Sequence, residues 1–216
     1  MGGSSPNALT SDGVTQLFAV NVLGHAVLLD ALLKADKLTT VAVFSGSEAA
    51  RGVSRMGMKR PSLPTSSMAD FKSIADGSHF TPDVDPMVSY GPVKYLGAMW
   101  MAGMAREYPN IRFVTMSPGG TSGTDAINKL SGPQKFFMTW IGMPLMPLFG
   151  MMHGLETGAK RYVDAINDAQ YATGHFYASH DPYTTGDIVD QSTIFSDLSD
   201  HSFQDNAKAA VYEFVA

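Results

Sequence analysis

Long apolar runs alternate with short β-branched runs along this chain. Residues 14–33, VTQLFAVNVLGHAVLLDALL, are apolar on nearly every side and contain no Pro, and residues 10–12 supply candidate caps. We therefore expect a buried helix there. TTVAVFSG follows from Thr39, and its β-branched residues ending in Gly predict a strand buried on both faces.

The same alternation continues to the end of the chain. Strands are expected at residue 111, IRFVTMSPGG, and at residue 174, GHFYAS. Helices are expected over residues 90–106, 155–166 and 203–214, with a short one near 68–74. This rhythm predicts an α/β fold, in which a partial Rossmann-like parallel sheet is flanked by helices in three α/β/α layers. No internal repeat or linker divides the chain, so residues 1–216 are expected to form a single domain.

The two long helices carry more apolar surface than one core face requires. Leu residues surround the first helix, and Met99, Trp100 and Met101 are consecutive in the second. One face of each helix can pack on the sheet. The other is a candidate subunit interface, so we expect a possible homo-oligomer through these two helices.

Composition and charge exclude several classes of function. Hydrophobic residues make up 44% of the 216 residues and charged residues 16%, which supports a packed globular protein. The net charge of -5 gives no reason to expect nucleic acid as a partner. The chain has no Cys, and its six His show no metal-ligand spacing, so a metal site is not expected. Without a charged and then apolar leader at Met1, a cytoplasmic location is expected.

The stretch SYGPVK at residues 89–94 carries candidate acid/base chemistry. Tyr90 and Lys94 are four residues apart and share one helix face. If Ser89 is the N-cap, Pro92 falls in the first turn, where it is tolerated. A nearby cation and the positive end of a helix both lower the pKa of a phenol. The pair therefore predicts a proton-transfer device, although two unrelated polar residues at a helix start would give the same spacing.

Four stretches occur in the order found in the short-chain dehydrogenase/reductase family, which the sequence resembles over nearly its whole length. They are LFAVNVLGHAVLL at Leu17, VAVFSGSEAARG at Val41, SYGPVK at Ser89 and FVTMSPGGTSGT at Phe113. The likeness is greatest to the branch with a long insert before the active-site helix, as in protochlorophyllide-reductase-like and retinol-dehydrogenase-like members. The resemblance implies an oxidoreductase that uses NAD or NADP.

The resemblance also implies residue roles. Tyr90 would donate or accept the proton, and Lys94 would lower its pKa and bind the nicotinamide ribose. Asn21 would hold a water of the proton relay, and Ser47 would orient the substrate carbonyl or hydroxyl. The loop after the second strand would contact the nicotinamide carboxamide and a phosphate, through Pro118, Gly119, Gly120, Thr121 and Thr124.

Two of these assignments leave alternatives open. Matching the strand ends without a gap puts Gly46 in the serine position, a slip selects Ser45, and the following SEAARG selects Ser47. We prefer Ser47, because Gly46 can take the turn that aims the next hydroxyl into the crevice. Both hydroxyls could instead satisfy the backbone at a strand end. Asn21 could be a structural residue that bonds to a neighbouring loop.

One family feature is absent from the sequence. No G-x-x-x-G-x-G or G-x-G-x-x-G follows an N-terminal strand, and Met1 falls where the family's fourth strand would be ending. A strand, a glycine turn and a helix N-terminus are needed to cradle a pyrophosphate. We therefore expect a fragment or a truncated form, with an exposed sheet edge that favours self-association.

Two segments fall outside the regular alternation. Residues 51–87 are polar and broken, which predicts an insert on the rim of the crevice. Their Arg51, Arg55, Lys59 and Arg60 could contact a phosphate or form a solvated basic surface. Residues 125–152 are expected to form an apolar substrate lid. Within them, the Met-rich run 136–152 is uncharged but contains two Pro, so contact with a membrane is a weaker alternative.

The sequence leaves two functional classes. The first is an NAD(P)-dependent oxidoreductase that acts on a small apolar alcohol or carbonyl compound, with Tyr90 as acid/base. The second is a truncated, non-catalytic remnant or interaction module that cannot bind a dinucleotide. Measurable affinity for a nicotinamide cofactor discriminates between them.

Overall fold

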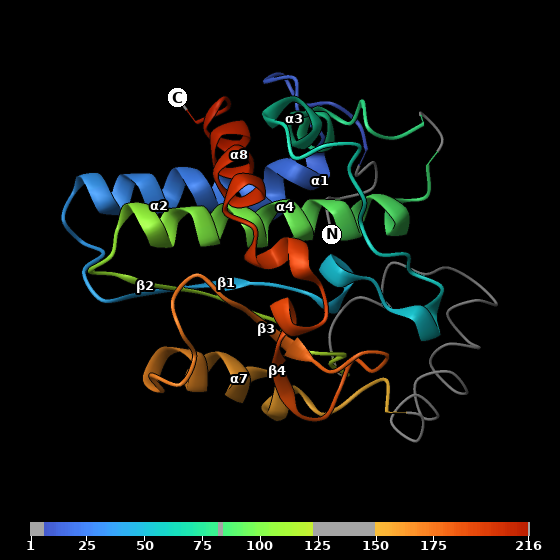
Figure 1. Cartoon of the computed structure of the whole chain (residues 1–216), viewed down its shortest axis with the longest axis vertical. Helices are drawn as coiled ribbons and strands as arrows, with labels where there is room; N and C mark the ends of the chain where they lie inside the picture. The colour runs from blue at the N-terminus through green and yellow to red at the C-terminus, as the bar shows by residue number, and fades with distance from the viewer. Residues whose placement is uncertain (1–6, 82–83, 123–149, 216) are drawn as a thin grey trace.

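The computed structural model describes residues 7–81, 84–122 and 150–215 (Figure 1). These residues form one α/β unit. The strands are β1 Val41–Ser45, β2 Arg112–Met116, β3 Phe176–Ser179 and β4 Ile188–Asp190. The helices are α1 Gln16–Phe18, a π-helical turn Ala19–Leu23, α2 Gly24–Lys34, α3 Met68–Asp76, α4 Pro86–Glu107, α7 Leu155–Asn167 and α8 His201–Tyr212. The 3-10 turns are Glu48–Arg51, Ser54–Met56, Gln191–Thr193 and Ser196–Ser199.

The sheet is mixed, which corrects the prediction of a parallel sheet. The strand order is β1-β2-β3-β4, and β1 with β2 and β2 with β3 pair in parallel. β4 pairs antiparallel with β3, with Tyr177 opposite Asp190 and Ser179 opposite Ile188. β4 follows β3 after eight residues, from His180 to Asp187. Such a short connection can only return the chain antiparallel, because a parallel neighbour needs a crossover of a dozen or more residues.

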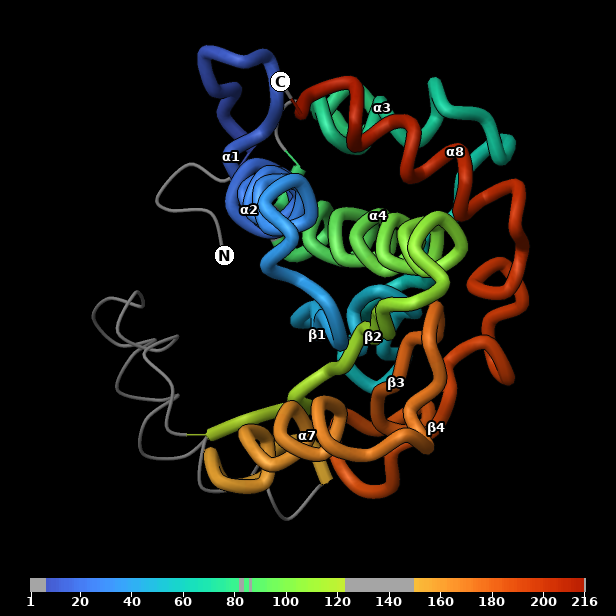
Figure 2. Tube along the Cα trace, turned by 90° about the vertical axis from the view of Figure 1, so that its left-hand side faces the viewer, coloured from blue at the N-terminus to red at the C-terminus, as the bar shows by residue number. Residues whose placement is uncertain are grey.

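The two faces of the sheet are covered by different helices. α2 and α4 lie on one face and α7 on the other (Figures 1 and 2). Alternate residues of β2 follow the strand period of two. Phe113 belongs to the large cluster that contains Trp100 of α4, whereas Val114 and Met116 belong to a small cluster with Ala165 of α7. The described residues therefore form three layers.

The helices before β2 and β3 lie on opposite sides of the sheet. β1 is followed by α4 and then β2, and α7 comes directly before β3. Both steps move in the same direction across the sheet, yet α4 and α7 cover opposite faces (Figure 2). The β1-α4-β2 and β2-α7-β3 units therefore have opposite hands, and one of them has the rare left hand.

The first long helix differs in its start and its regularity from the prediction. α1, the π-helical turn and α2 form one helix over Gln16–Lys34. Its N-cap is Thr15, whose hydroxyl accepts from Phe18 N, rather than a residue of 10–12. By length and composition it is the one helix of the described residues that could cross a membrane, a test that a core helix also passes. On its outer side Val20 is 60% exposed and Leu28 57%.

α4 begins one turn earlier than the sequence suggested. Asp85 is the N-cap, and its carboxylate accepts from Met87 N at 2.8 Å. Ser89 and Tyr90 therefore lie inside the helix, and so does Pro92. Because Pro has no N–H, the carbonyl of Val88 receives no helical hydrogen bond from that position.

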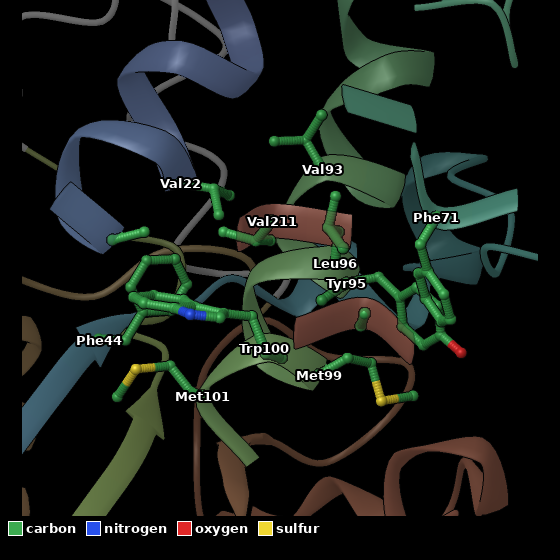
Figure 3. Close-up of a cluster of buried hydrophobic side chains, with 14 of the residues drawn as sticks. Val22, Phe44, Phe71, Val93, Tyr95, Leu96, Met99, Trp100, Met101 and Val211 are labelled. Atoms are coloured by element: carbon green, nitrogen blue, oxygen red, sulfur yellow. The ribbon is translucent and has the colours of Figure 1, made fainter. Parts of the chain in front are cut away.

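Both faces of α4 are buried within the chain (Figure 3). A Cβ on Gly97 would come within 2.7 Å of the Phe44 ring of β1, and one on Gly103 within 2.8 Å of the Gln204 carbonyl of α8. Because Gly97 and Gly103 have no side chains, α4 can approach β1 on one side and α8 on the other. Near its start, however, α4 exposes Met87 at 41% and Val88 at 59%. The homo-oligomer through the two long helices stays a prediction.

The predicted insert, residues 51–87, divides between two places. Its start lies at the carboxyl ends of the strands, in the 3-10 turn Glu48–Arg51. Its one helix, α3, packs against α4 and α8 instead, with Phe71 and Ile74 fully buried. Residues 86–87 already belong to α4. Of the predicted lid, 125–152, all but residues 150–152 lies outside the described residues.

Candidate functional site at the carboxyl ends of the strands

Gly46 separates two serines at the end of β1. Its N–H donates to the Met116 carbonyl at 2.9 Å and continues the pairing of β1 with β2. A Cβ on Gly46 would come within 2.8 Å of both the Phe176 ring and the Thr115 methyl group. The glycine is therefore required by close packing, and its φ is not positive.

The two serines point to different tyrosines. Ser45 Oγ lies 2.7 Å from the Tyr162 hydroxyl of α7. The Ser47 side chain interacts instead with the Tyr90 phenol of α4, which lowers the pKa of that phenol. Ser47 is also the N-cap of Glu48–Arg51, where its Oγ accepts from Ala49 N at 3.2 Å. Of the three positions considered for the serine role, Ser47 is thus the one whose hydroxyl meets Tyr90.

Lys94 lies one turn beyond Tyr90 on α4. Its Nζ is 5.8 Å from the centre of the Tyr90 ring and 5.3 Å from that of Phe44. It donates a hydrogen bond to the Ser45 carbonyl at 2.9 Å. Burial lowers the pKa of Lys94 to about 8, because the cation is removed from water. The predicted helix face therefore exists, but the ammonium is bonded to the end of β1.

The pKa of Tyr90 moves opposite to the prediction. Burial of the phenol raises its pKa, the bond from Ser47 lowers it in part, and Tyr162 and Glu48 raise it further. Lys94 is not among the groups that shift it in this structure. Tyr90 also lies in the second turn of α4, beyond the positive helix end that the sequence reading invoked. The unliganded site therefore holds Tyr90 as the neutral acid.

Asn21 occupies the π-helical turn before α2. The side chain is 8% exposed, and its Nδ2 donates to the Leu17 carbonyl of the same helix at 2.9 Å. No hydrogen bond within the described residues joins it to Ser47, Tyr90 or Lys94. π-helical turns occur frequently at functional sites. The turn packs against α4, but the Asn21 bond shown here is structural.

The turn after β2 is closed by the chain itself. Gly119 has a φ of +79°, and a Cβ there would lie 2.7 Å from the His153 ring and from the Thr184 carbonyl. A Cβ on Gly120 would lie 1.9 Å from the Met151 carbonyl. The Pro118 carbonyl accepts from His153 Nε2 at 2.7 Å and from Thr121 Oγ1 at 3.4 Å. These glycines are required for packing of the chain against itself.

The threonines predicted to bind cofactor are only partly described. Thr121 Oγ1 donates to the Gly119 carbonyl at 3.2 Å, and its backbone pairs with His153. Thr124 lies outside the described residues. In the described part of this loop, the Gly119 amide donates to Ser117 Oγ, the Gly120 amide to the Thr184 carbonyl and the Ser122 amide to the His153 carbonyl.

Glu48 is a buried carboxylate that the sequence reading missed. It is 4% exposed and directly follows Ser47. Its Oε2 accepts from Ser117 Oγ at 2.6 Å, and its Oε1 accepts from Ser179 N at 3.1 Å. Arg161 of α7 lies 3.7 Å from the same Oε1. One carboxylate therefore links the carboxyl ends of β1, β2 and β3.

Two buried arginines complete this network. Arg161, 3% exposed, donates to Ser179 Oγ at 3.0 Å and to the Gly186 carbonyl at 2.9 Å. Arg51, 2% exposed, donates to the Ser179 carbonyl at 3.0 Å and to Asp181 at 2.8 Å. Burial lowers the pKa of both guanidinium groups, and the neighbouring Glu48 opposes that change.

The predicted basic cluster of the insert consists of one buried residue, Arg51, and three exposed residues, Arg55, Lys59 and Arg60. Arg51 points into the protein, as described above. Arg55 stacks over the Tyr183 ring at 5.2 Å and Arg60 over the Phe195 ring at 4.7 Å. Of the four, Lys59 is an exposed residue with no ring contact of this kind. The two guanidinium groups are thus used to cover aromatic surface.

An apolar cavity of about 330 Å³ runs beside β1 on the edge away from β2. Leu28, Leu29 and Leu32 of α2 and Trp100 of α4 line it, and it reaches Ser45. No described residue hydrogen-bonds to the outward backbone groups of Val43 in the middle of that edge. In residues 7–81, 84–122 and 150–215, no group of three or more His, Asp and Glu side chains could hold a metal ion.

No protein-family model and no curated protein matches this chain. Among solved structures, it is similar to the crystal structure of an uncharacterized protein from Mycobacterium Paratuberculosis, with a TM-score of 0.59 and 17% sequence identity. The match covers 97% of this chain and 62% of that chain, so this chain spans less than two thirds of that structure. At this identity the likeness shows a shared α/β fold and nothing about activity.

Proposed function

We propose that this chain carries the proton-transfer residues of an NAD(P)-dependent oxidoreductase of the short-chain dehydrogenase/reductase type, built on a Rossmann-like sheet. The observation that carries the proposal is the grouping of three side chains: Lys94 Nζ lies 5.8 Å from the centre of the Tyr90 ring, and the Ser47 side chain interacts with the Tyr90 phenol. The three groups meet at the carboxyl end of β1, the edge at which open α/β sheets bind ligands.

The roles of the chain's own groups follow from their protonation. Tyr90 is held neutral by burial, so it can donate its proton to a carbonyl oxygen that Ser47 holds by a hydrogen bond. A bound nicotinamide would supply the hydride to the carbonyl carbon. The carbonyl becomes an alcohol, and Tyr90 is left as a phenolate that Lys94 can stabilise and solvent can reprotonate.

The fit to a dinucleotide is partial. Tyr90 and Lys94 suit the nicotinamide ribose, as the family resemblance implies. The Gly119-Gly120 turn is filled by Met151, His153 and Thr184, so it offers no cradle for a pyrophosphate. The sequence also has no glycine-rich motif of that kind. No step of the proposal therefore depends on the position of the cofactor's phosphates.

The apolar substrate class is supported by the cavity beside β1. Its lining is aliphatic and aromatic, with Ser45 and His25 as polar members. The cavity ends at Ser45, whose carbonyl accepts from Lys94, so it offers apolar surface near the proposed catalytic groups, although Ser47 and Tyr90 do not line it.

A non-catalytic interaction module is the second candidate. The observation that favours it is the open edge of β1, with unpaired backbone groups at Val43 and the same apolar cavity alongside. Such an edge can accept a further strand. On this reading, Ser47 and Tyr90 are bonded only to stabilise the strand end.

Cofactor binding and a comparison of the Tyr90→Phe and Tyr162→Phe variants test the proposal. NADH and NADPH fluorescence is titrated with the chain, and turnover is followed at 340 nm with a panel of apolar aldehydes and ketones. We expect Tyr90→Phe to lower kcat by about 10²- to 10⁴-fold. Tyr162→Phe, the matched control on the other serine, should retain kcat within about tenfold.

The contrary outcomes are specific. Equal activity of Tyr90→Phe and the unaltered chain would refute the assigned acid. No binding of either dinucleotide at millimolar concentration would favour the interaction module.

A further inference from the structure

The Glu48 carboxylate lies beside the proposed site but has no role in the proposed proton transfer. It stands next to Ser47 in the chain, but its own hydrogen bonds go to Ser117 Oγ and Ser179 N. Ser117 Oγ in turn accepts from Gly119 N at 3.1 Å. A chain of hydrogen bonds therefore runs from the residue after Ser47 to the turn after β2.

Stability alone is a weak reason for such a group. Removing a carboxylate and a guanidinium from water costs free energy, and apolar replacements of buried pairs are often equally stable. Arg161 Nη1 lies 3.7 Å from Glu48 Oε1, and both side chains are at most 5% exposed. The carboxylate's two short bonds instead fix the positions of three strand ends.

We propose that Glu48 is a positioning residue of the candidate site. Its buried carboxylate holds Ser47 against Tyr90 and holds the Pro118-Gly119 turn at the same edge. That this edge is a functional site rests on the proposed function, whereas the coupling of Glu48 to Tyr90 and to Gly119 does not. Glu48 would touch neither substrate nor cofactor, and it acts through Ser47 and Ser117.

Charged and titratable groups surround both Glu48 and Tyr90. Glu48 faces Arg161 of α7, and Arg51 from its own 3-10 turn also interacts with it electrostatically. Tyr90 has Lys94 on its own helix and Tyr162 from α7 nearby. The negative charge of Glu48 contributes to the raised pKa of Tyr90, because it disfavours a second negative charge.

The first experiment follows the Tyr90 phenol in the ligand-free chain. Tyrosine labelled with ¹³C at Cζ is titrated by NMR, and Tyr90→Phe assigns the Tyr90 signal. In Glu48→Gln we expect the Tyr90 midpoint to move to lower pH, because a negative charge that raises the pKa of Tyr90 is lost. A role in packing alone would not move it in that direction.

Asp190→Asn is the matched control. Asp190 also accepts several hydrogen bonds, from Ser192 and His175, but on β4 rather than beside the Ser47-Tyr90 pair. This control should leave the Tyr90 midpoint unchanged. A folded Glu48→Gln variant with an unchanged Tyr90 midpoint would overturn the proposal.

A second variant decides the question if Glu48→Gln does not fold. Ser117→Ala keeps the charge and removes the hydroxyl between Glu48 and Gly119. We expect the Gly119 amide to exchange its hydrogen about tenfold faster, the effect of about one lost hydrogen bond, while Tyr90 keeps its midpoint. Unchanged exchange at Gly119 would overturn the coupling. Neither measurement uses a cofactor or substrate, so failure of the proposed function would appear separately, as absent dinucleotide binding.

Discussion

The two faces of the sheet each present one serine-tyrosine pair, and the pairs differ in what supports them. Tyr90 lies on α4, a helix buried on both sides between the sheet and α8. Tyr162 lies on α7, whose Val163 and Leu155 are 55% and 58% exposed. A serine-tyrosine pair is thus supported by a buried, rigid helix on one face of the sheet and by a partly exposed helix on the other. A catalytic pair needs the rigid support, so the comparison favours Tyr90.

The largest effect is expected from breaking the supporting face. Trp100 is fully buried between α4 and Phe44 of β1 (Figure 3). Trp100→Ala should lower the free energy of unfolding by about 3–5 kcal/mol, because it leaves a cavity in the large core. Urea denaturation measures this. Val163→Ala on the exposed side of α7 is the control and should change the value by no more than about 0.5 kcal/mol. A loss below about 1 kcal/mol in Trp100→Ala would show that the α4 face is not the rigid one.

A smaller effect, of opposite sign, is expected at Lys94. Burial lowers its pKa from 10.5 to about 8, which corresponds to a cost of roughly 3 kcal/mol at neutral pH. Lys94→Met removes that cost and also loses the bond to the Ser45 carbonyl, worth about 1 kcal/mol. We therefore expect this variant to be more stable by about 2 kcal/mol at pH 7.

The pH dependence gives the sign test for Lys94. Between about pH 8 and 10.5 the unfolded chain binds a proton at this residue that the folded chain does not, so the stability of the unaltered protein rises with pH. The advantage of Lys94→Met should fade over that window and be absent above it. Lys160→Met, at an exposed lysine paired with Asp164, is the control and should show no such window. A destabilised Lys94→Met at pH 7 would mean that the cation contributes more than it costs.

The smallest effect is expected for the second pair. Tyr162→Phe loses the bond to Ser45 Oγ and should cost about 0.5–1.5 kcal/mol by urea denaturation. Ser45→Ala should cost a similar amount. The double variant should cost less than the sum, because both changes remove the same bond. Additive costs would show that the two hydroxyls are not coupled in solution.

Regular elements with strong periodicity could be predicted from the sequence. The helix expected at 155–166 is Leu155–Asn167, and the one near 68–74 is Met68–Asp76. Both carry one apolar face, which the period of 3.6 identifies. β4 was missed because three residues, Ile188–Asp190, are too short to show an alternating pattern. The start of α4 was wrong because Asp85 and Ser89 are both good caps, and propensity does not rank them.

At the site, the local spacing of residues could be predicted from the sequence, whereas burial by residues distant in the sequence could not. The four-residue spacing does bring Tyr90 and Lys94 to one face, and Ser47 does meet Tyr90. Glu48 and Arg161 could not be foreseen, because charged residues are rarely buried without partners, and these partners lie far away in the sequence. The direction of the Tyr90 pKa was missed for the same reason, since burial raises that pKa and Lys94 is not among the groups that shift it.

The link from Glu48 to three strand ends bears on the order in which the protein folds. Its two hydrogen bonds close loops of 69 and 131 residues. Loop-closure entropy must be overcome before such contacts form, so they should be absent from the rate-limiting barrier. Weakening them should accelerate unfolding while refolding keeps its rate, and the lifetime of the native state would be set at this edge.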